Sequence, residues 1–333
     1  MLPTGKLPPE LLRRLLARAP ITDERVVVRP GPGLDCAVVD LGDRLLVMKS
    51  DPITFATDEI GWYLVQVSAN DLATTGATPR WLLLTMLLPE GGTTARRVEA
   101  WAGQVFDACQ ALGISVIGGH TEITHGLERP IMAGTLIGEV ARERLVTPDG
   151  ARPGDRVLLT KGVPIEGTAL AAREFAGRLA GVLNADEVAE ARAYLRQPGI
   201  SVVRDAQIAL TAGRVTAMHD PTEGGLAGAL WELAEACGHS LEVDLDRVPV
   251  PALAAKVCAA LGIDPLRTIA SGALLLTAPP QDAASIIGAL EAAGITCAGI
   301  GQVGEGEPVV AAKGLGRLPR PARDEIARLF ETE

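Results

Sequence analysis

Residues 67–79 of the chain are VSANDLATTGATP, a helical run that Gly76 and Pro79 bring to an end. The run consists of small and apolar residues except for Asn70 and Asp71 near its middle. A carboxylate in such surroundings costs free energy unless it is paired or bound to a metal. Asp71 is therefore a candidate functional residue, with capping or pairing inside its own helix as the structural alternative.

On both sides of this run, short apolar segments bounded by Gly and Pro predict strands, and longer periodic segments predict helices. In the first half we expect strands at 26–28, 37–39, 45–48, 81–88, 115–117 and 131–140, and helices at 58–75 and 93–111. A turn cluster, ARPGD at 151–155, precedes a second half of similar composition that ends with a helix from Pro321. Because strands and helices do not alternate strictly, the pattern predicts an α+β protein with two domains, 1–148 and 149–333.

The composition is that of a folded, acidic protein. The chain has 333 residues, which suggests about two domains, and 41 Asp plus Glu against 31 Lys plus Arg give a net charge of −10. Without a basic run, a nucleic acid is not expected as the main partner. No stretch approaches the ~20 apolar residues of a membrane span, the N-terminus lacks the pattern of a secretion signal, and the five cysteines are scattered. We therefore expect a cytoplasmic protein with no membrane partner.

Several common motifs are absent or incomplete. There is no GxxxxGK[ST] phosphate loop. The segment GIGQVG at 299–304 matches GxGxxG, but EGEP follows it where a dinucleotide site needs a helix, so it predicts a strand edge and a turn. His120-Thr121-Glu122 is similar to the HxE of zinc deaminases, but no PCxxC completes the metal site. A structural zinc is therefore not expected.

Acidic residues at strand ends and in loops are the main remaining candidates. Asp35 lies in a Gly-rich loop, Asp51 follows a strand, and Asp220 follows a strand expected at 215–218. Carboxylates presented from several loops suit Mg²⁺, which is usually held by one or two of them together with substrate phosphates. Each residue taken alone also has a structural interpretation, as a turn former or a helix cap.

Two Gly-rich turns that lead into helices, KGVPIEG at 161–167 and EGG at 223–225, suit the phosphates of a nucleotide. The candidate phosphate-binding residues in these turns are Lys161, Gly162, Gly167, Gly224 and Gly225.

Taken together, the segments resemble the AIR synthase superfamily, which includes AIR synthase, thiamine-monophosphate kinase, selenophosphate synthetase and the hydrogenase-maturation protein HypE. The similar segments, in family order, are GPGLDCAVVD (31–40), KSDPIT (49–54), VSANDLATTGATP (67–79), ISVIGGHTEIT (114–124), GARPGD (150–155), LLTKGVPIEGTAL (158–170), MHDPTEGGLAGAL (218–230), IASGALLL (269–276) and IGQVGEG (300–306). SDPIT, HDPTEGGL and IGQVGEG are most similar to HypE and HypE-like proteins.

The resemblance implies a two-domain AIR synthase-like fold, with an N-terminal α/β domain and a C-terminal α+β domain. The N-terminal domain would carry the acids that bind ATP and Mg²⁺. It would also form the interface of a homodimer. The implied metal and phosphate-site acids are Asp35, Asp51, Asp71 and Asp220. Asn70 would support Asp71, and Gly118 and Gly119 would approach the nucleotide closely. The candidate catalytic residues are Asp71, His120 and Glu122.

Two departures from HypE matter. HypE ends in a flexible tail whose terminal cysteine is converted to a thiocyanate, whereas this sequence ends LFETE and its last cysteine is Cys297, inside an expected strand. HypE also has GGDT where this chain has His120 after the two glycines. We hypothesise that Glu122 replaces the missing carboxylate, and we do not expect thiocyanate formation on this chain.

Three functions follow from the resemblance. The first is a HypE-like, ATP- and Mg²⁺-dependent enzyme that activates an unidentified small substrate by phosphorylation or dehydration. The alternative reaction is that of a thiamine-monophosphate kinase, which needs no cysteine. The third belongs to another class: a non-catalytic nucleotide-binding scaffold that assists a partner protein in hydrogenase metallocentre maturation.

Overall fold

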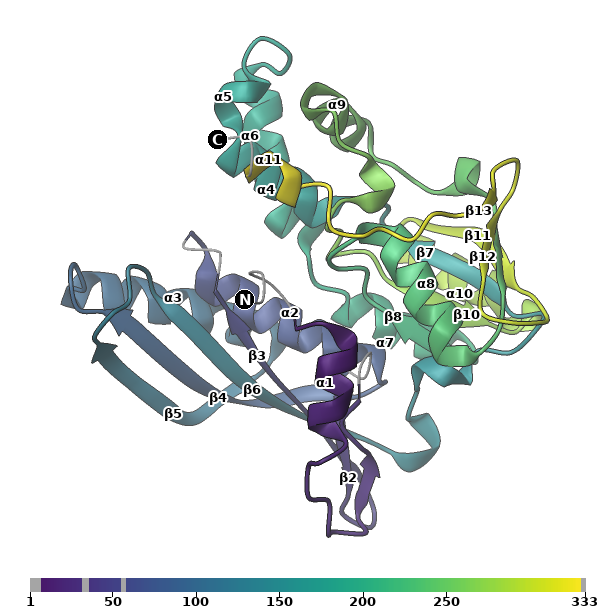
Figure 1. The fold of residues 1–333 in the computed structure, drawn as a ribbon, viewed down its shortest axis with the longest axis horizontal. Helices are drawn as coiled ribbons and strands as arrows, with labels where there is room; N and C mark the ends of the chain where they lie inside the picture. Colours follow the sequence, from purple (N-terminus) through teal and green to yellow (C-terminus); the bar gives the residue numbers. More distant parts are fainter. Residues whose placement is uncertain (1–6, 32–35, 55–57, 331–333) are drawn as a thin grey trace. The chain divides into compact units, whose positions relative to one another are not determined.

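The computed structural model describes residues 7–31, 36–54 and 58–330, and the chain forms two compact units, Met1–Leu145 and Val146–Glu333 (Figure 1). Each unit contains one β-sheet with helices packed on it, so the expected α+β class is confirmed. No helix in the described ranges combines the length and the apolar character that crossing a membrane requires.

The N-terminal sheet has six strands in the order β1-β2-β3-β6-β4-β5. They are β1 (Val26–Val28), β2 (Ala37–Asp40), β3 (Leu45–Ile53), β4 (Thr78–Pro89), β5 (Ser115–Thr124) and β6 (Ile131–Val140). Neighbouring strands are antiparallel except β4 and β5, which are parallel and are joined by α3 (Ala95–Leu112), because a parallel pair needs a crossover connection. A short helix, α1 (Pro9–Leu16), precedes the sheet.

One face of this sheet is covered by α2 (Ile60–Thr74), which also packs against α3 (Figure 1). Alternate residues of β6 are buried and half-buried, as expected when one face of a strand meets the core. Gly61 permits the close approach of α2 and α3, because a Cβ atom there would lie 2.8 Å from the backbone nitrogen of Val105. The other face is partly exposed; Leu83 of β4, for example, keeps 39% of its surface in solvent.

The C-terminal sheet has seven strands in the order β13-β12-β9-β11-β7-β10-β8. The strands are β7 (Arg156–Thr160), β8 (Ala217–His219), β9 (Leu241–Val243), β10 (Leu275–Ala278), β11 (Cys297–Val303), β12 (Val310–Ala312) and β13 (Gly316–Arg317). The helices of this unit are α4 (Ile165–Glu174), α5 (Ala176–Leu179), α6 (Ala185–Ala193), α7 (Val203–Ala212), α8 (Gly225–Cys237), α9 (Ala252–Leu261), α10 (Pro280–Ala292) and α11 (Ala327–Phe330).

Two apolar clusters form the core of the C-terminal unit. In the larger one, Leu226 and Leu230 of α8 pack with Val157 and Leu159 of β7. Because side chains alternate along a strand, Arg156 and Leu158 of β7 face the other way, toward α10, which contacts β7 and β11. The smaller cluster joins α4 and α9 to the end of the chain.

Three expected elements were clearly wrong in extent. The strand expected at 45–48 continues to Ile53, so Asp51 lies inside β3 and does not follow a strand. The strand expected at 115–117 continues to Thr124, because Gly118 and Gly119 stay paired with β4 instead of forming a loop. The helix expected from Pro321 is only the single turn of α11, because the backbone before it bonds elsewhere; the Glu325 amide, for instance, donates to the Arg267 carbonyl. The interpretation of residues 299–304 as strand and turn is confirmed by β11.

Candidate functional site

Asp71 is buried in α2 and forms an ion pair with Lys49 of β3. The Lys49 Nζ and Asp71 Oδ2 atoms are 2.9 Å apart, and the two side chains are only 14% and 7% exposed. Asp71 is therefore paired, as the structural alternative to a functional role predicted. Its partner, however, comes from a strand and not from its own helix. The Asp71 carbonyl oxygen additionally accepts hydrogen bonds from the Thr74 hydroxyl and the Cys36 thiol.

Lys49 and Asp51 reach this buried side of the sheet because of strand alternation. Leu45 and Val47 of β3 are buried toward α2, and Lys49 and Asp51 follow them at the same spacing of two. Asp51 is half-buried, opposite Gly134 of β6. The structure thus places two of the four candidate metal ligands, Asp51 and Asp71, on one side of the N-terminal sheet.

Two further candidates in the same unit behave differently. Asn70, which precedes Asp71, is fully buried in α2. Asp35 lies outside the residues that the structure describes.

His120 and Glu122 lie on the opposite face of the sheet from Asp71. Both belong to β5, where they pair in register with Thr85 and Leu87 of β4, on the face that α2 does not cover. The His120 Nε2 and Glu122 Oε2 atoms are 3.1 Å apart, and the side chains are 64% and 47% exposed. Within the N-terminal unit, the structure brings His120 and Glu122 together and keeps them apart from Asp71.

Gly118 and Gly119 sit at a bulge in β5, and both have positive φ angles, 155° and 144°. A Cβ atom on Gly119 would lie 1.7 Å from the carbonyl oxygen of Leu84, so no side chain fits there. A Cβ atom on Gly118 would meet only the Leu83 side chain, at 3.5 Å. Close approach of β5 to β4 therefore accounts for Gly119, whereas Gly118 is open enough to approach a ligand.

Lys161 of the first Gly-rich turn is directed into the C-terminal unit. Its Nζ atom lies 3.2 Å from Asp205 Oδ2 of α7 and donates to the Ser201 carbonyl. The Thr160 hydroxyl donates to the other Asp205 oxygen at 2.7 Å. Burial lowers the pKa of the Lys161 ammonium group, and the charge of Asp205 opposes this effect. The lysine expected to bind phosphate thus has an internal anionic partner.

The glycines of this turn are required by packing. Gly162 has a φ of 100°, and a Cβ atom there would lie 2.5 Å from the Pro249 carbonyl oxygen. A Cβ atom on Gly167 would lie 2.5 Å from the methyl carbon of Thr268. These contacts explain both residues without a ligand.

The second Gly-rich turn already holds a carboxylate of the chain itself. Asp324 Oδ2 accepts a hydrogen bond from the Gly224 amide at 2.7 Å, at the start of α8, and Asp324 Oδ1 accepts one from the Ile326 amide. The N-terminus of a helix favours an anion, and here Asp324 is that anion. Gly225 has a φ of 61°, and a Cβ atom there would lie 2.6 Å from the Thr268 carbonyl oxygen.

Glu166 of α4 lies near this turn and is buried. Burial raises the pKa of the Glu166 carboxyl to about 7; a hydrogen bond with Ser271 lowers it, while the charges of Asp324 and Glu223 raise it further. Burial likewise raises the pKa of Asp324, against the effect of its backbone hydrogen bonds. The start of α8 is therefore an acidic, poorly solvated region.

Asp220, the fourth candidate metal ligand, is buried in the C-terminal unit beside His219, whose Nδ1 atom is 3.9 Å from Asp220 Oδ1. His219 Nε2 also contacts Glu232 of α8 at 2.7 Å. Across all the residues that the structure describes, no three or more His, Cys, Asp or Glu side chains are arranged to hold a metal ion.

Sequence reasoning did not single out four buried charged residues of these sites: Lys49, Glu166, Asp205 and Asp324. Lys49 could have been identified from the sequence, because it follows the buried residues Leu45 and Val47 of β3 at a spacing of two and therefore lies on the same face of the strand. Asp205 and Asp324 carry no comparable local signal, because their partners are distant in sequence.

With this geometry in view, we compared the chain with known proteins. The family model described as AIR synthase related protein, N-terminal domain, matches residues 33–140, and the corresponding C-terminal domain model matches residues 152–313. The carbamoyl dehydratase HypE of Azotobacter vinelandii is 30% identical over 299 residues, which cover 86% of this chain and 82% of that protein.

Two solved structures extend the comparison. A hydrogenase maturation protein HypE in complex with ATP is 26% identical with a TM-score of 0.68, covering 87% of this chain and 90% of that one. The thiamine monophosphate kinase of Aquifex aeolicus is 21% identical with a TM-score of 0.69, covering 92% and 96%, and this similarity shows the fold alone.

The two matched domains define the class of the protein as a two-domain AIR synthase-like fold, as expected. The chain belongs to the AIR synthase related family, and HypE is among its relatives.

Proposed function

We propose that this protein binds ATP with Mg²⁺ and activates a small substrate by phosphorylation or dehydration. The observation that supports the proposal most directly is the buried Lys49–Asp71 pair. Burying two charges is often no better for stability than packing apolar side chains in their place. A charged pair between β3 and the apolar helix α2 is therefore expected where the charges also serve a ligand.

The donor set suits magnesium. Asp51 and Asp71 supply hard carboxylate oxygens from the same side of the N-terminal sheet. Mg²⁺ needs only one or two protein carboxylates when phosphate oxygens and waters complete its shell, so the absence of a group of three among the described residues does not oppose it. When bound, the ion would neutralise charge on the nucleotide phosphates. Asp35 belongs to the same proposed set, and Asp220 of the C-terminal unit stays a candidate ligand on the sequence resemblance alone.

The acceptor of the reaction is proposed to be an external small molecule and not one of the cysteines. Cys297 is buried in β11, and burial raises the pKa of its thiol to about 12. Burial raises the pKa of Cys258 to about 12 and that of Cys109 to about 11. A thiolate is the nucleophilic form of cysteine, so these thiols are poorly suited to accept a group.

Isothermal titration calorimetry with ATP, in the presence and absence of Mg²⁺, tests the proposal. We expect binding in the wild type that depends on Mg²⁺ and is weakened about tenfold or more in Asp51→Asn. Asp107→Asn, which changes an exposed carboxylate on α3 by the same chemistry, is the matched control. If the wild type does not bind ATP, the proposal is wrong, and if Asp51→Asn binds ATP as the wild type does, the assignment of Asp51 to the nucleotide site is wrong.

A second candidate function is a nucleotide-binding scaffold without turnover, which would assist a maturation partner protein. It is favoured by the internal partners of both Gly-rich turns, Asp205 on Lys161 and Asp324 on Gly224. Conversion of ATP to ADP, measured alone and with thiamine monophosphate as a trial substrate, separates the candidates, because ADP forms whether the phosphoryl group goes to water or to the substrate. Turnover supports an enzyme, and turnover that requires thiamine monophosphate supports the kinase reaction.

The homodimer and the cytoplasmic location belong to the same proposal. The face of the N-terminal sheet opposite α2 includes the apolar side chain of Leu83, which stays 39% exposed. Light scattering on the purified protein tests the dimer, and Leu83→Glu is expected to shift it toward the monomer.

A further inference from the structure

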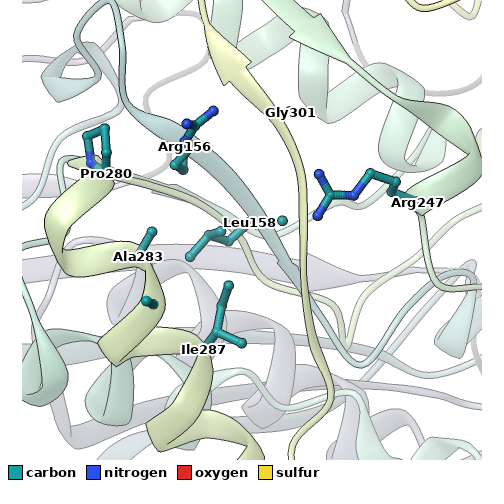
Figure 2. Close-up of a pocket in the computed structure, with 9 residues that line it drawn as sticks. Arg156, Leu158, Arg247, Pro280, Ala283, Ile287 and Gly301 are labelled. Atoms are coloured by element: carbon teal, nitrogen blue, oxygen red, sulfur yellow. The ribbon is translucent and has the colours of Figure 1, made fainter.

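The C-terminal unit contains a pocket on the side of its sheet that faces α10 (Figure 2). The pocket has a volume of about 380 Å³ and opens between the first turns of α10 and strands β7 and β11. Leu158 of β7 lies at its centre, and Ala283 and Ile287 of α10 form one wall. It is built from residues of the C-terminal unit alone and shares none with the candidate nucleotide site.

The charges around the pocket are of one sign. Its charged lining residues are Arg156 of β7 and Arg247, which follows β9, and no acidic side chain lines it. Figure 2 shows the two arginines on either side of β11. Both are exposed, so their long side chains reach the opening at little desolvation cost. The pocket mouth is therefore locally cationic although the whole chain has a net charge of −10.

The partners of the arginines leave them available. Arg156 donates one hydrogen bond, from Nη1 to the amide oxygen of Gln302 at 3.1 Å, which neutralises no charge. Arg247 Nη2 would lie 3.7 Å from a Cβ atom placed on Gly299. In the described part of the chain no carboxylate lies within ion-pair distance of either guanidinium group. The nearby Asp244 pairs with Lys313, which is the main cause of its lowered pKa, and the charge of Arg247 makes only a minor contribution.

Gly299 keeps the floor of the pocket open. A Cβ atom there would make only ordinary contacts, 3.6 Å from Leu158 Cδ2 and 3.7 Å from Arg247 Nη2. Packing therefore does not demand glycine at this position. At Gly301, two residues along, a Cβ atom would lie 2.2 Å from the Glu242 carbonyl oxygen, and packing does demand it. The space above Gly299 is free volume between an apolar floor and a guanidinium group.

We propose that this pocket binds a small amphiphilic anion, independently of the nucleotide. A carboxylate or phosphate head would lie between Arg156 and Arg247, because guanidinium groups form charge-assisted hydrogen bonds with both. A short apolar chain would lie on Leu158 against Ala283 and Ile287. The apolar floor excludes a purely ionic ligand such as free phosphate as the preferred occupant, since it would leave this surface uncovered.

Titration calorimetry on the full chain with hexyl phosphate tests the proposal. We expect hexyl phosphate to bind about tenfold or more tightly than inorganic phosphate or hexanol, because only the ester matches both parts of the pocket. Heptanoate in place of hexyl phosphate shows whether a carboxylate head serves as well. Arg247→Gln is expected to weaken hexyl phosphate about tenfold. Arg320→Gln removes an exposed arginine that pairs with Glu235, away from the pocket, and is expected to change nothing.

Gly299→Ala provides the steric test. The added methyl group fits the fold but fills the floor, so we expect weaker hexyl phosphate binding with an unchanged melting temperature. Equal binding to the wild type, Arg247→Gln and Gly299→Ala would overturn the proposal. Displacement of hexyl phosphate by ATP would overturn its independence from the nucleotide. Neither result depends on whether the acids of the N-terminal unit bind Mg²⁺.

Discussion

Lys49 of β3 and Asp71 of α2 meet inside the N-terminal unit, with Nζ and Oδ2 separated by 2.9 Å and both side chains largely withdrawn from water. The pair joins the sheet to the helix that covers it. It also explains how a helix as apolar as α2 accommodates a carboxylate at residue 71, since the charge is balanced by a lysine that strand alternation directs to the same side.

Removing one partner of this pair is expected to destabilise the protein. Lys49→Met removes the ammonium group that lies 2.9 Å from the buried Asp71 carboxylate, and loss of one partner of a buried pair costs about 3–5 kcal/mol, whereas the double variant Lys49→Met/Asp71→Leu recovers most of the loss. Urea unfolding followed by tryptophan fluorescence measures both. Glu122→Gln, in the exposed pair with His120, is the control and is expected to change the free energy of unfolding by about 1 kcal/mol or less. If Lys49→Met changed the free energy of unfolding by no more than the control does, the Lys49–Asp71 pair would not contribute to stability as proposed.

The two glycines of β5 are expected to differ in their tolerance of a methyl group. Both Gly118→Ala and Gly119→Ala incur strain from a positive φ, about 1–2 kcal/mol. Only Gly119→Ala also drives a Cβ atom into the Leu84 carbonyl oxygen. We therefore expect Gly119→Ala to separate β5 from β4, seen as faster amide hydrogen exchange in 115–124, while Gly118→Ala leaves that exchange near the wild-type rate. Equal protection in the two variants would contradict the close approach of the strands.

Stability of the C-terminal unit is expected to depend on pH through Glu166. Its folded-state pKa of about 7 lies above the ordinary value of 4.5, so the folded state binds the proton more tightly than the unfolded state does. The resulting stabilisation is fully present below pH 4.5 and is lost as the pH rises to about 7, with a magnitude on the order of 3 kcal/mol. Glu166→Gln keeps an uncharged side chain at all pH values, so it should be more stable than the wild type at pH 8 and similar at pH 5.

Urea unfolding at the two pH values checks this expectation. Glu305→Gln, at an exposed position in the turn after β11, is the control and should follow the wild type at both. A Glu166→Gln variant that is less stable than the wild type at pH 8 would show that the ionised carboxylate is needed there.

The end of the chain is expected to loosen when Asp324 is removed. Asp324→Ala deprives the Gly224 and Ile326 amides of their acceptor, and loss of such a cap costs about 0.5–2 kcal/mol. Limited proteolysis should then cut more readily within 318–330, a segment that the wild type holds against α8 and α4. Glu291→Ala, an exposed substitution on α10, controls for the loss of a negative charge. Unchanged cleavage in Asp324→Ala would mean that apolar contacts alone hold the segment.

Much of the fold follows from local patterns. The apolar segment at 131–140 predicted β6 to the residue, and the periodic segment at 93–111 predicted α3 within one or two residues. The long β5 was not predicted beyond residue 117, since two glycines in succession resemble a loop until a neighbouring strand is known to accept them.

For the candidate site, the amino-acid sequence alone determined that a carboxylate at residue 71 must be balanced and that the Gly-rich segments beginning at residues 161 and 223 lead into helices, which start at Ile165 and Gly225. The tertiary structure decided which groups partner the Asp71 carboxylate and the polar groups of the two Gly-rich segments. Lys49 reaches Asp71, Asp205 reaches Lys161, and Asp324 reaches the Gly224 amide. Each partner is distant in the chain, so no local period encodes the contact. The same holds for the separation of His120 and Glu122 from Asp71, because the face on which a side chain lies depends on the register of β5 against β4.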